Sequence, residues 1–114
     1  MTSIHPTAII SDTAFIGANV QIGPYAVIGE AHIGQGVEVL PGAFIGKGPK
    51  GAGALARAPE FERLVEIGDE CSIGPHAVVF YDVKIGSNTL LGDGASIREQ
   101  CRVGSRCILS RSSP

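Results

Sequence analysis

Three histidines are the side chains of this 114-residue chain best suited to move a proton at neutral pH. His76 follows Gly74 and Pro75, a pair that turns a chain, so we expect its imidazole to be exposed on a corner. His5 fits an N-terminal corner, and His32 fits a turn or a partly buried, satisfied position. Because a general base needs an accessible nitrogen, His76 is the preferred candidate.

Glu99 is the second candidate base, because a carboxylate can take this role when burial raises its pKa. Arg98 precedes it in the chain, however, and an exposed ion pair between the two is the simpler interpretation. Tyr81 and Asp82 are candidate substrate-binding residues that could hydrogen-bond a sugar or a nucleotide. The same pair is also compatible with an ordinary polar corner.

These residues lie in a chain with a fixed six-residue period, and such a period determines architecture before local propensity does. Each repeat carries an aliphatic side chain at one position and a smaller side chain two residues earlier, such as Cys71 before Ile73. The aliphatic positions are Ile67, Ile73, Val79, Ile85, Leu91, Ile97, Val103 and Leu109. Six residues match neither the helical period nor the heptad, so the pattern predicts a short strand followed by a corner.

The strand-and-corner repeat predicts a three-sided column. In the segment from Cys71 to Ile73, residues two apart share a face, so Cys71 and Ile73 point inward and Ser72 points outward. Three repeats close one coil, and successive coils stack at strand spacing, with like side chains above one another. We therefore predict an all-β, parallel β-helix of roughly five to six coils.

The first half of the chain keeps the same period with two departures. The step from Ile28 to Ile33 is five residues, so one corner is a residue short. Residues 46–58 break the period and are rich in glycine, which predicts one projecting loop beside a site. A phosphate cradle is the less favoured interpretation, because no strand-to-helix context or GxxxxGK[ST] pattern surrounds these glycines. Lys47 and Lys50, in this interval, are candidate substrate-binding residues.

Counting repeats predicts which corners share an edge of the column. With Phe61 taken as a repeat position, the corner that contains His76 lies one coil above the exit of the loop. The corner that contains Asp93 lies one coil above His76, which makes Asp93 a further candidate substrate-binding residue. We therefore expect His76, Asp93 and the loop on one edge.

Length and composition favour one domain over residues 1–114 and exclude several functions. The net charge of −2 and the few aromatic residues argue against nucleic-acid binding. No apolar run is long enough to span a membrane and nothing resembles a signal peptide, so a cytoplasmic location is expected. The three cysteines occupy the small inward position, so core packing accounts for them, and no metal site is expected.

The repeat resembles the hexapeptide-repeat acyltransferases, whose fold is a left-handed parallel β-helix. The segment Ile-His-Pro-Thr-Ala at residues 4–8, with Ile-Gly-Ala-Asn-Val-Gln-Ile-Gly-Pro at 16–24, resembles the start of the bacterial lipid A pathway acyltransferases. This resemblance implies a homotrimer with active sites between neighbouring columns. It also implies acyl transfer, expected to be acetyl transfer, from coenzyme A or acyl carrier protein to an amino or hydroxyl group of a sugar or sugar nucleotide. No permanently bound cofactor is implied.

The resemblance departs at one position and leaves alternatives open. The lipid A family has the run His-Ile-Ala-His-Asp-Cys, and Glu99 in Ser-Ile-Arg-Glu-Gln-Cys stands where its catalytic histidine would be.

One alternative is a non-catalytic column that serves as a trimerisation or structural module. A zinc-dependent carbonic-anhydrase-type column would need three converging histidines. The last repeat has no terminal cap, which is typical of the N-terminal part of a longer chain.

Overall fold

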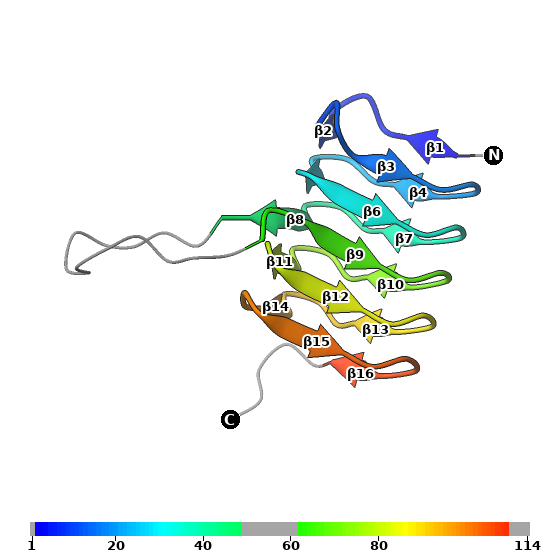
Figure 1. The fold of residues 1–114 in the computed structure, drawn as a ribbon. Helices are drawn as coiled ribbons and strands as arrows, with labels where there is room; N and C mark the ends of the chain where they lie inside the picture. The colour runs from blue at the N-terminus through cyan, green and yellow to red at the C-terminus, as the bar shows by residue number, and fades with distance from the viewer. Residues whose placement is uncertain (1, 49–61, 110–114) are drawn as a thin grey trace, which may run out of the picture.

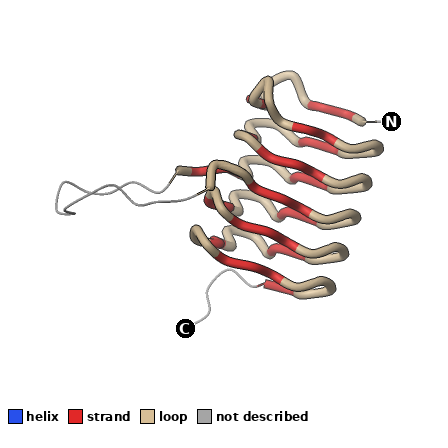
Figure 2. The backbone as a smooth tube through the Cα atoms, in the orientation of Figure 1, coloured by secondary structure: helices blue, strands red, loops and turns tan. Residues whose placement is uncertain are grey.

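The computed structural model describes residues 2–48 and 62–109, which form a three-sided column of parallel strands (Figures 1 and 2). Within these residues no helix occurs, and none could therefore cross a membrane. The strands pair into a six-stranded sheet and two five-stranded sheets, each with parallel register between successive coils. The predicted all-β fold, a left-handed parallel β-helix, is confirmed, with about five turns.

Each sheet takes every third strand of the chain. The first sheet contains β1 (Ser3–Ile4), β4 (Gln21–Ile22), β7 (Glu38–Val39), β10 (Ser72–Ile73), β13 (Leu90–Leu91) and β16 (Ile108–Leu109). The second sheet contains β2 (Ile9–Ile10), β5 (Val27–Ile28), β8 (Phe44–Lys47), β11 (Val78–Phe80) and β14 (Ser96–Ile97). The third sheet contains β3 (Phe15–Ile16), β6 (Ala31–Ile33), β9 (Val65–Ile67), β12 (Val83–Ile85) and β15 (Cys101–Val103).

The core is built from the two inward positions of each repeat, stacked in register. Ile28, Ile45 and Val79 lie above one another in the second sheet and are all buried. The small inward position is filled in the same way, with Ala26, Ala43 and Ala77 buried beside them. Since equivalent residues stack on one another, each coil packs chiefly on the coils directly below and above it.

Most corners after the first coil are tight turns that place one residue at positive φ. In the corner before β11, the Ala77 N–H donates to the Gly74 carbonyl at 3.2 Å, and His76 has φ 59°. Gly42 and Gly94 take the same place one coil below and one coil above, at φ 76° and 68°. Proline before this position sets φ for the first central residue of the turn. The corner therefore fixes the backbone at His76 independently of any ligand.

The three cysteines are free thiols in the small inward position, as predicted. Cys71 is buried and its thiol donates to the Gly86 carbonyl at 3.1 Å, whereas Cys101 and Cys107 are half-buried near the last coil. Burial raises the pKa of the Cys71 thiol, which keeps it protonated. These cysteines are part of the core.

Candidate functional site

Two edges of the column carry the candidate residues. The edge between the first and second sheets, called here the His76 edge, consists of corners 5–8, 23–26, 40–43, 74–77 and 92–95. The edge between the second and third sheets, called the Tyr81 edge, consists of links 11–14, 29–30, 48–64, 81–82 and 98–100. The second sheet separates the two edges, so they do not meet within one column.

His76 and Asp93 share the His76 edge, as predicted. Both side chains are exposed, and with Pro75 and Gly94 they line a hollow of about 390 Å³. The imidazole lies over Gly42, where an added Cβ would come within 2.5 Å of Nδ1. Because Gly42 has no side chain, the imidazole can lie against the backbone of the coil below. Gly94, in the coil above, has no side chain that would cover the ring. An accessible imidazole in a hollow is suitable for proton transfer.

The expectation that the loop leaves beside His76 is wrong. Strand β9 pairs with β6 and β12, so Ile67 follows Ile45 by one face of the column and not by two. The link 48–64 therefore replaces a single corner on the Tyr81 edge, and Phe61, which lies outside the described residues, cannot be counted as a repeat of its own. The expected loop 46–58 also starts too early, because β8 continues through Lys47.

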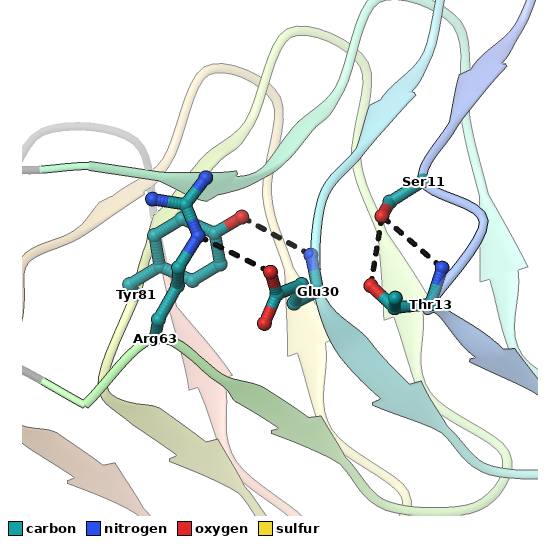
Figure 3. Close-up of polar contacts among 5 residues, drawn as sticks. All are labelled: Ser11, Thr13, Glu30, Arg63 and Tyr81. Atoms are coloured by element: carbon teal, nitrogen blue, oxygen red, sulfur yellow. Dashed lines mark hydrogen bonds and ion pairs between the residues drawn. The ribbon is translucent and has the colours of Figure 1, made fainter.

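Tyr81 is buried, contrary to a role in direct contact with substrate. Only 4% of the residue is exposed, and its hydroxyl accepts the Glu30 N–H at 3.1 Å (Figure 3). Glu30 belongs to the shortened corner that the five-residue step from Ile28 to Ile33 predicts. The tyrosine of the fourth coil thus contacts the second coil at the level where the third has the long link.

Arg63 covers the Tyr81 ring from outside. Its guanidinium carbon lies 5.1 Å from the ring centroid, and its Nε lies 3.3 Å from Oε1 of Glu30. Figure 3 shows these three side chains together on the Tyr81 edge, with Ser11 and Thr13 of the first coil beyond them. A guanidinium over an aromatic face is attracted to the ring and shields it from water.

Glu99 is held in an ion pair with its neighbour Arg98. Arg98 Nη2 lies 3.0 Å from Oε1 of Glu99, and both guanidinium nitrogens of the fork contact the carboxylate. The hydrogen bonds from Arg98 lower the pKa of the Glu99 carboxyl. A carboxylate with a lowered pKa is a weaker base, so the geometry favours the ion-pair interpretation over general-base chemistry at this position.

Lys47 and Asp82 lie on the same edge as Glu99. The Lys47 ammonium sits 5.4 Å from the centroid of the Phe80 ring, and the Arg98 guanidinium sits 4.3 Å from that centroid. Asp82 is half-buried, and its Oδ1 accepts from Arg102 Nη2 at 3.2 Å. Among the described residues, Lys47 forms no ion pair. Lys50 lies outside the residues that the structure describes.

The three histidines do not converge. His5 lies in the first coil of the His76 edge, where it bonds Thr7, while His76 lies in the fourth coil. His32 is neither in a turn nor partly buried, the two positions that the sequence suggested. It is exposed, points outward from β6 and contacts the Phe15 ring edge-on at 6.0 Å. In the part of the chain that is described, no three His, Cys, Asp or Glu side chains are grouped to hold a metal ion.

Sequence reasoning missed the cations and the aromatic ring that organise the Tyr81 edge. Phe80 carries two cations, Arg63 covers Tyr81, and Arg102 holds Asp82. Arg102 could have been placed from the period, because it lies one coil after Lys84 and pairs with it in register. Arg63 carried no such signal, since the count through the link 48–64 was not fixed by spacing.

The repeat itself matches a known family. Residues 13–47 match the bacterial transferase hexapeptide family (six repeats). An acyl-[acyl-carrier-protein]–UDP-N-acetylglucosamine O-acyltransferase from Psychrobacter is 36% identical over 102 residues, which are 90% of this chain and 27% of the relative. The chain thus spans about a quarter of that relative's length.

Solved structures share the column. LpxA from Acinetobacter baumannii matches with a TM-score of 0.71 and 29% identity, over 94% of this chain and 50% of that one. PerB from Caulobacter crescentus, solved with CoA and GDP-perosamine, matches with a TM-score of 0.57 over 98% of this chain and 52% of that one. At 19% identity the second likeness shows the fold alone. In repeat, sequence and fold, the chain is similar to the hexapeptide-repeat acyltransferases.

Proposed function

We propose that this hexapeptide-repeat protein is an acyltransferase that moves an acyl group, in particular acetyl, from coenzyme A or acyl carrier protein to an amino or hydroxyl group of a sugar or sugar nucleotide. The name of the Psychrobacter relative supports a sugar-nucleotide acceptor and an acyl-carrier-protein donor, and PerB, which shares the fold, was solved with CoA and GDP-perosamine. The observation that carries the proposal is the exposed imidazole of His76 in its hollow on a column of this type. A cytoplasmic location is part of the proposal, since acyl-coenzyme A is the expected donor.

His76 acts as the general base in this proposal. Its imidazole takes the proton from the acceptor amine or hydroxyl as that atom forms a bond to the thioester carbonyl carbon. The carbon–sulfur bond then breaks, and the imidazolium returns the proton to the leaving thiolate. The proton is therefore transferred from acceptor to thiol, and His76 ends the cycle as a neutral imidazole. Asp93, in the same hollow, binds the acceptor's polar groups.

A trimer is proposed because one face of the column is apolar. The second sheet presents Ile9, Val27, Phe44 and Val78 outward in four successive coils, with Ile9 and Phe44 exposed. The third sheet presents charged Glu66, Lys84 and Arg102 at its outward positions. An apolar stripe on one face indicates an interaction surface, and identical columns bury it by turning it toward a common axis.

This packing would also join the two edges. When three triangular columns turn the second sheet inward, the His76 edge of one lies beside the Tyr81 edge of the next. His76 and Asp93 from one subunit would then face Lys47, Asp82 and Glu99 from its neighbour. Lys47 would bind the phosphate groups of a sugar nucleotide or of coenzyme A as a point charge. The proposed site is thus shared between subunits.

Incubation with acetyl-coenzyme A and a panel of amino sugars and sugar nucleotides tests the reaction, with release of free thiol as the readout. We expect release that His76→Ala abolishes and that Glu99→Gln reduces much less. Equal release from wild type, His76→Ala and Glu99→Ala would contradict the site assignment. His5→Ala is the matched control, because His5 lies on the same edge in the first coil.

Light scattering after size exclusion tests the trimer separately. Phe44→Asp places a charge in the apolar stripe and should give monomers, whereas Gln21→Asp, on the outer face of the first sheet, should leave the trimer intact. A monomeric wild type at high concentration would contradict the shared site.

The second candidate function is a non-catalytic trimerisation or structural module. The ion pair of Glu99 with Arg98 favours it, because Glu99 stands where the lipid A family has its catalytic histidine. A stable trimer that releases no thiol with any tested acceptor and shows no saturable binding of acetyl-coenzyme A would support this function instead.

A further inference from the structure

Among the described residues, the Tyr81 edge has no short corner in the third coil, and the side chain of Tyr81 lies at that level. The link between the second and third sheets is 29–30 in the second coil and 81–82 in the fourth, but 48–64 in the third. A stack of coils needs an edge at every level, because backbone groups of neighbouring corners otherwise lose their partners. In the third coil the side chain of Tyr81 provides this edge.

Two glycines form the slot for the ring. A Cβ at Gly29 would overlap the Tyr81 hydroxyl, and a Cβ at Gly46 would lie 3.0 Å from its Cε1. Gly46 also has φ 92°, which an L side chain rarely adopts, whereas Gly29 is not at positive φ. Both positions that the Tyr81 ring contacts are therefore glycines, which have no side chain.

Hydrogen bonds attach Tyr81, in the fourth coil, to the second and third coils. Its hydroxyl is the acceptor for the Glu30 N–H, and its own N–H donates to the Lys47 carbonyl at 3.0 Å. The next residue, Asp82, donates its N–H to the Leu64 carbonyl at 2.9 Å. Residues 81–82 therefore hold both described ends of the link 48–64, and with them the positions of Lys47 and Asp82.

We propose that Tyr81 is a positioning residue, which closes the third coil and fixes Lys47 and Asp82 in the half-site of the Tyr81 edge. This role differs from the direct substrate contact that the sequence suggests, which the burial of Tyr81 opposes. This inference rests on the proposed function for the role of that half-site. The closure of the coil itself depends only on the contacts of Tyr81.

The test is Tyr81→Phe, which keeps the ring in its slot and under Arg63 but removes the acceptor of the Glu30 N–H. Tyr25→Phe is the matched control, because Tyr25 is the other tyrosine and is 72% exposed on the His76 edge. Amide exchange of Glu30, followed by NMR, should accelerate by about tenfold in Tyr81→Phe and remain unchanged in Tyr25→Phe.

Steady-state kinetics distinguish positioning from a loss of stability, because a loss of stability alone would not change KM. If Tyr81 positions binding residues, Tyr81→Phe should raise KM for the acceptor several-fold at constant kcat, because uniform binding is lost while the chemistry at His76 is not. Gly29→Ala, which displaces the same hydroxyl from the other side, should show the same KM effect.

The outcomes separate the inference from the proposed function. Unchanged Glu30 exchange in Tyr81→Phe overturns the closure, and a raised KM with unchanged exchange shows direct substrate contact instead. If wild type transfers no acyl group, the proposed function and the positioning role fall together, whereas accelerated exchange still supports the closure of the coil. Faster exchange with unchanged KM and kcat overturns the positioning role alone.

Discussion

The His76 edge and the Tyr81 edge use the same repeat to opposite effect. On the His76 edge the corners have equal length, and the αL position is filled in turn by Tyr25, Gly42, His76 and Gly94. On the Tyr81 edge one link has two residues and the next runs from residue 48 to residue 64. On the His76 edge, a turn of fixed backbone conformation presents the His76 side chain. On the Tyr81 edge, the Tyr81 side chain stands in for the short corner of the third coil.

The comparison shows where a repeat protein can vary without losing its core. The inward positions continue through both departures, since Ile28, Ile45 and Val79 stay in register. The short link and the long link occur in adjacent coils at the same edge, so one Tyr81 side chain compensates for both. If this contrast is correct, substitutions on the His76 edge should mainly impair acyl transfer, and substitutions on the Tyr81 edge should mainly impair stability.

The largest expected effect is on the regular edge. His76→Ala should lower kcat/KM for acyl transfer by about 10² to 10⁴, the usual contribution of a positioned general base, with little change in the unfolding midpoint. Thiol release measures the loss of activity, and thermal unfolding of the same preparation measures the unfolding midpoint. A large loss of stability without a kinetic defect would make His76 structural and remove the contrast between the edges.

The second effect is on the irregular edge. Gly29→Ala should destabilise the fold by about 1–3 kcal/mol, because the added methyl group overlaps the Tyr81 hydroxyl in a filled slot. Gly104→Ala is the control, since its Cβ would meet only Cys107 Sγ at 3.8 Å. Urea unfolding of the two variants measures the difference. Equal stability of the two variants would show that the slot tolerates the methyl group.

A smaller effect is expected at the corner before His76. Pro75→Ala should cost about 0.4–1 kcal/mol, mainly because the unfolded chain gains freedom, while the turn keeps its hydrogen bond from Ala77 to Gly74. Thermal unfolding and the His76-dependent thiol release together test this. Loss of activity beyond the loss of folded protein would show that Pro75 also positions the imidazole.

The smallest effect concerns Glu99. Its carboxyl has a lowered pKa in the folded state, so its ion pair contributes stability above the pKa of the unfolded chain and loses it as pH falls through the folded pKa. Glu99→Gln should therefore cost up to about 1 kcal/mol at pH 7 and almost nothing in strong acid. Urea unfolding at both pH values checks this. If the free energies of unfolding of wild type and Glu99→Gln differ by the same amount at all pH values, the ion pair is contradicted.

The sequence alone predicts the column, but it does not predict how the chain runs along the two edges. Aliphatic residues at a constant step can be buried together only if the chain winds around one axis, so Ile67, Ile73 and Val79 predicted the core directly. Spacing cannot say whether an insertion replaces a corner or a corner and a face, so counting repeats predicts the loop beside His76. The pairing of β9 with β6 settles this point.

The site was predictable to the same extent. The shared edge of His76 and Asp93 follows from the period, because both lie on uninterrupted corners one coil apart. The burial of Tyr81 does not follow, because a corner residue normally faces water. It results from a contact across two coils, with Glu30, that no local pattern encodes.

Columns of this kind usually unfold by fraying from either end, because each layer feels only its immediate neighbours. The reach of Tyr81 from the fourth layer to the second breaks that independence. The middle of the molecule should thus melt as one cooperative block, while the outer layers, where Ile4 and Ile108 are exposed, open singly.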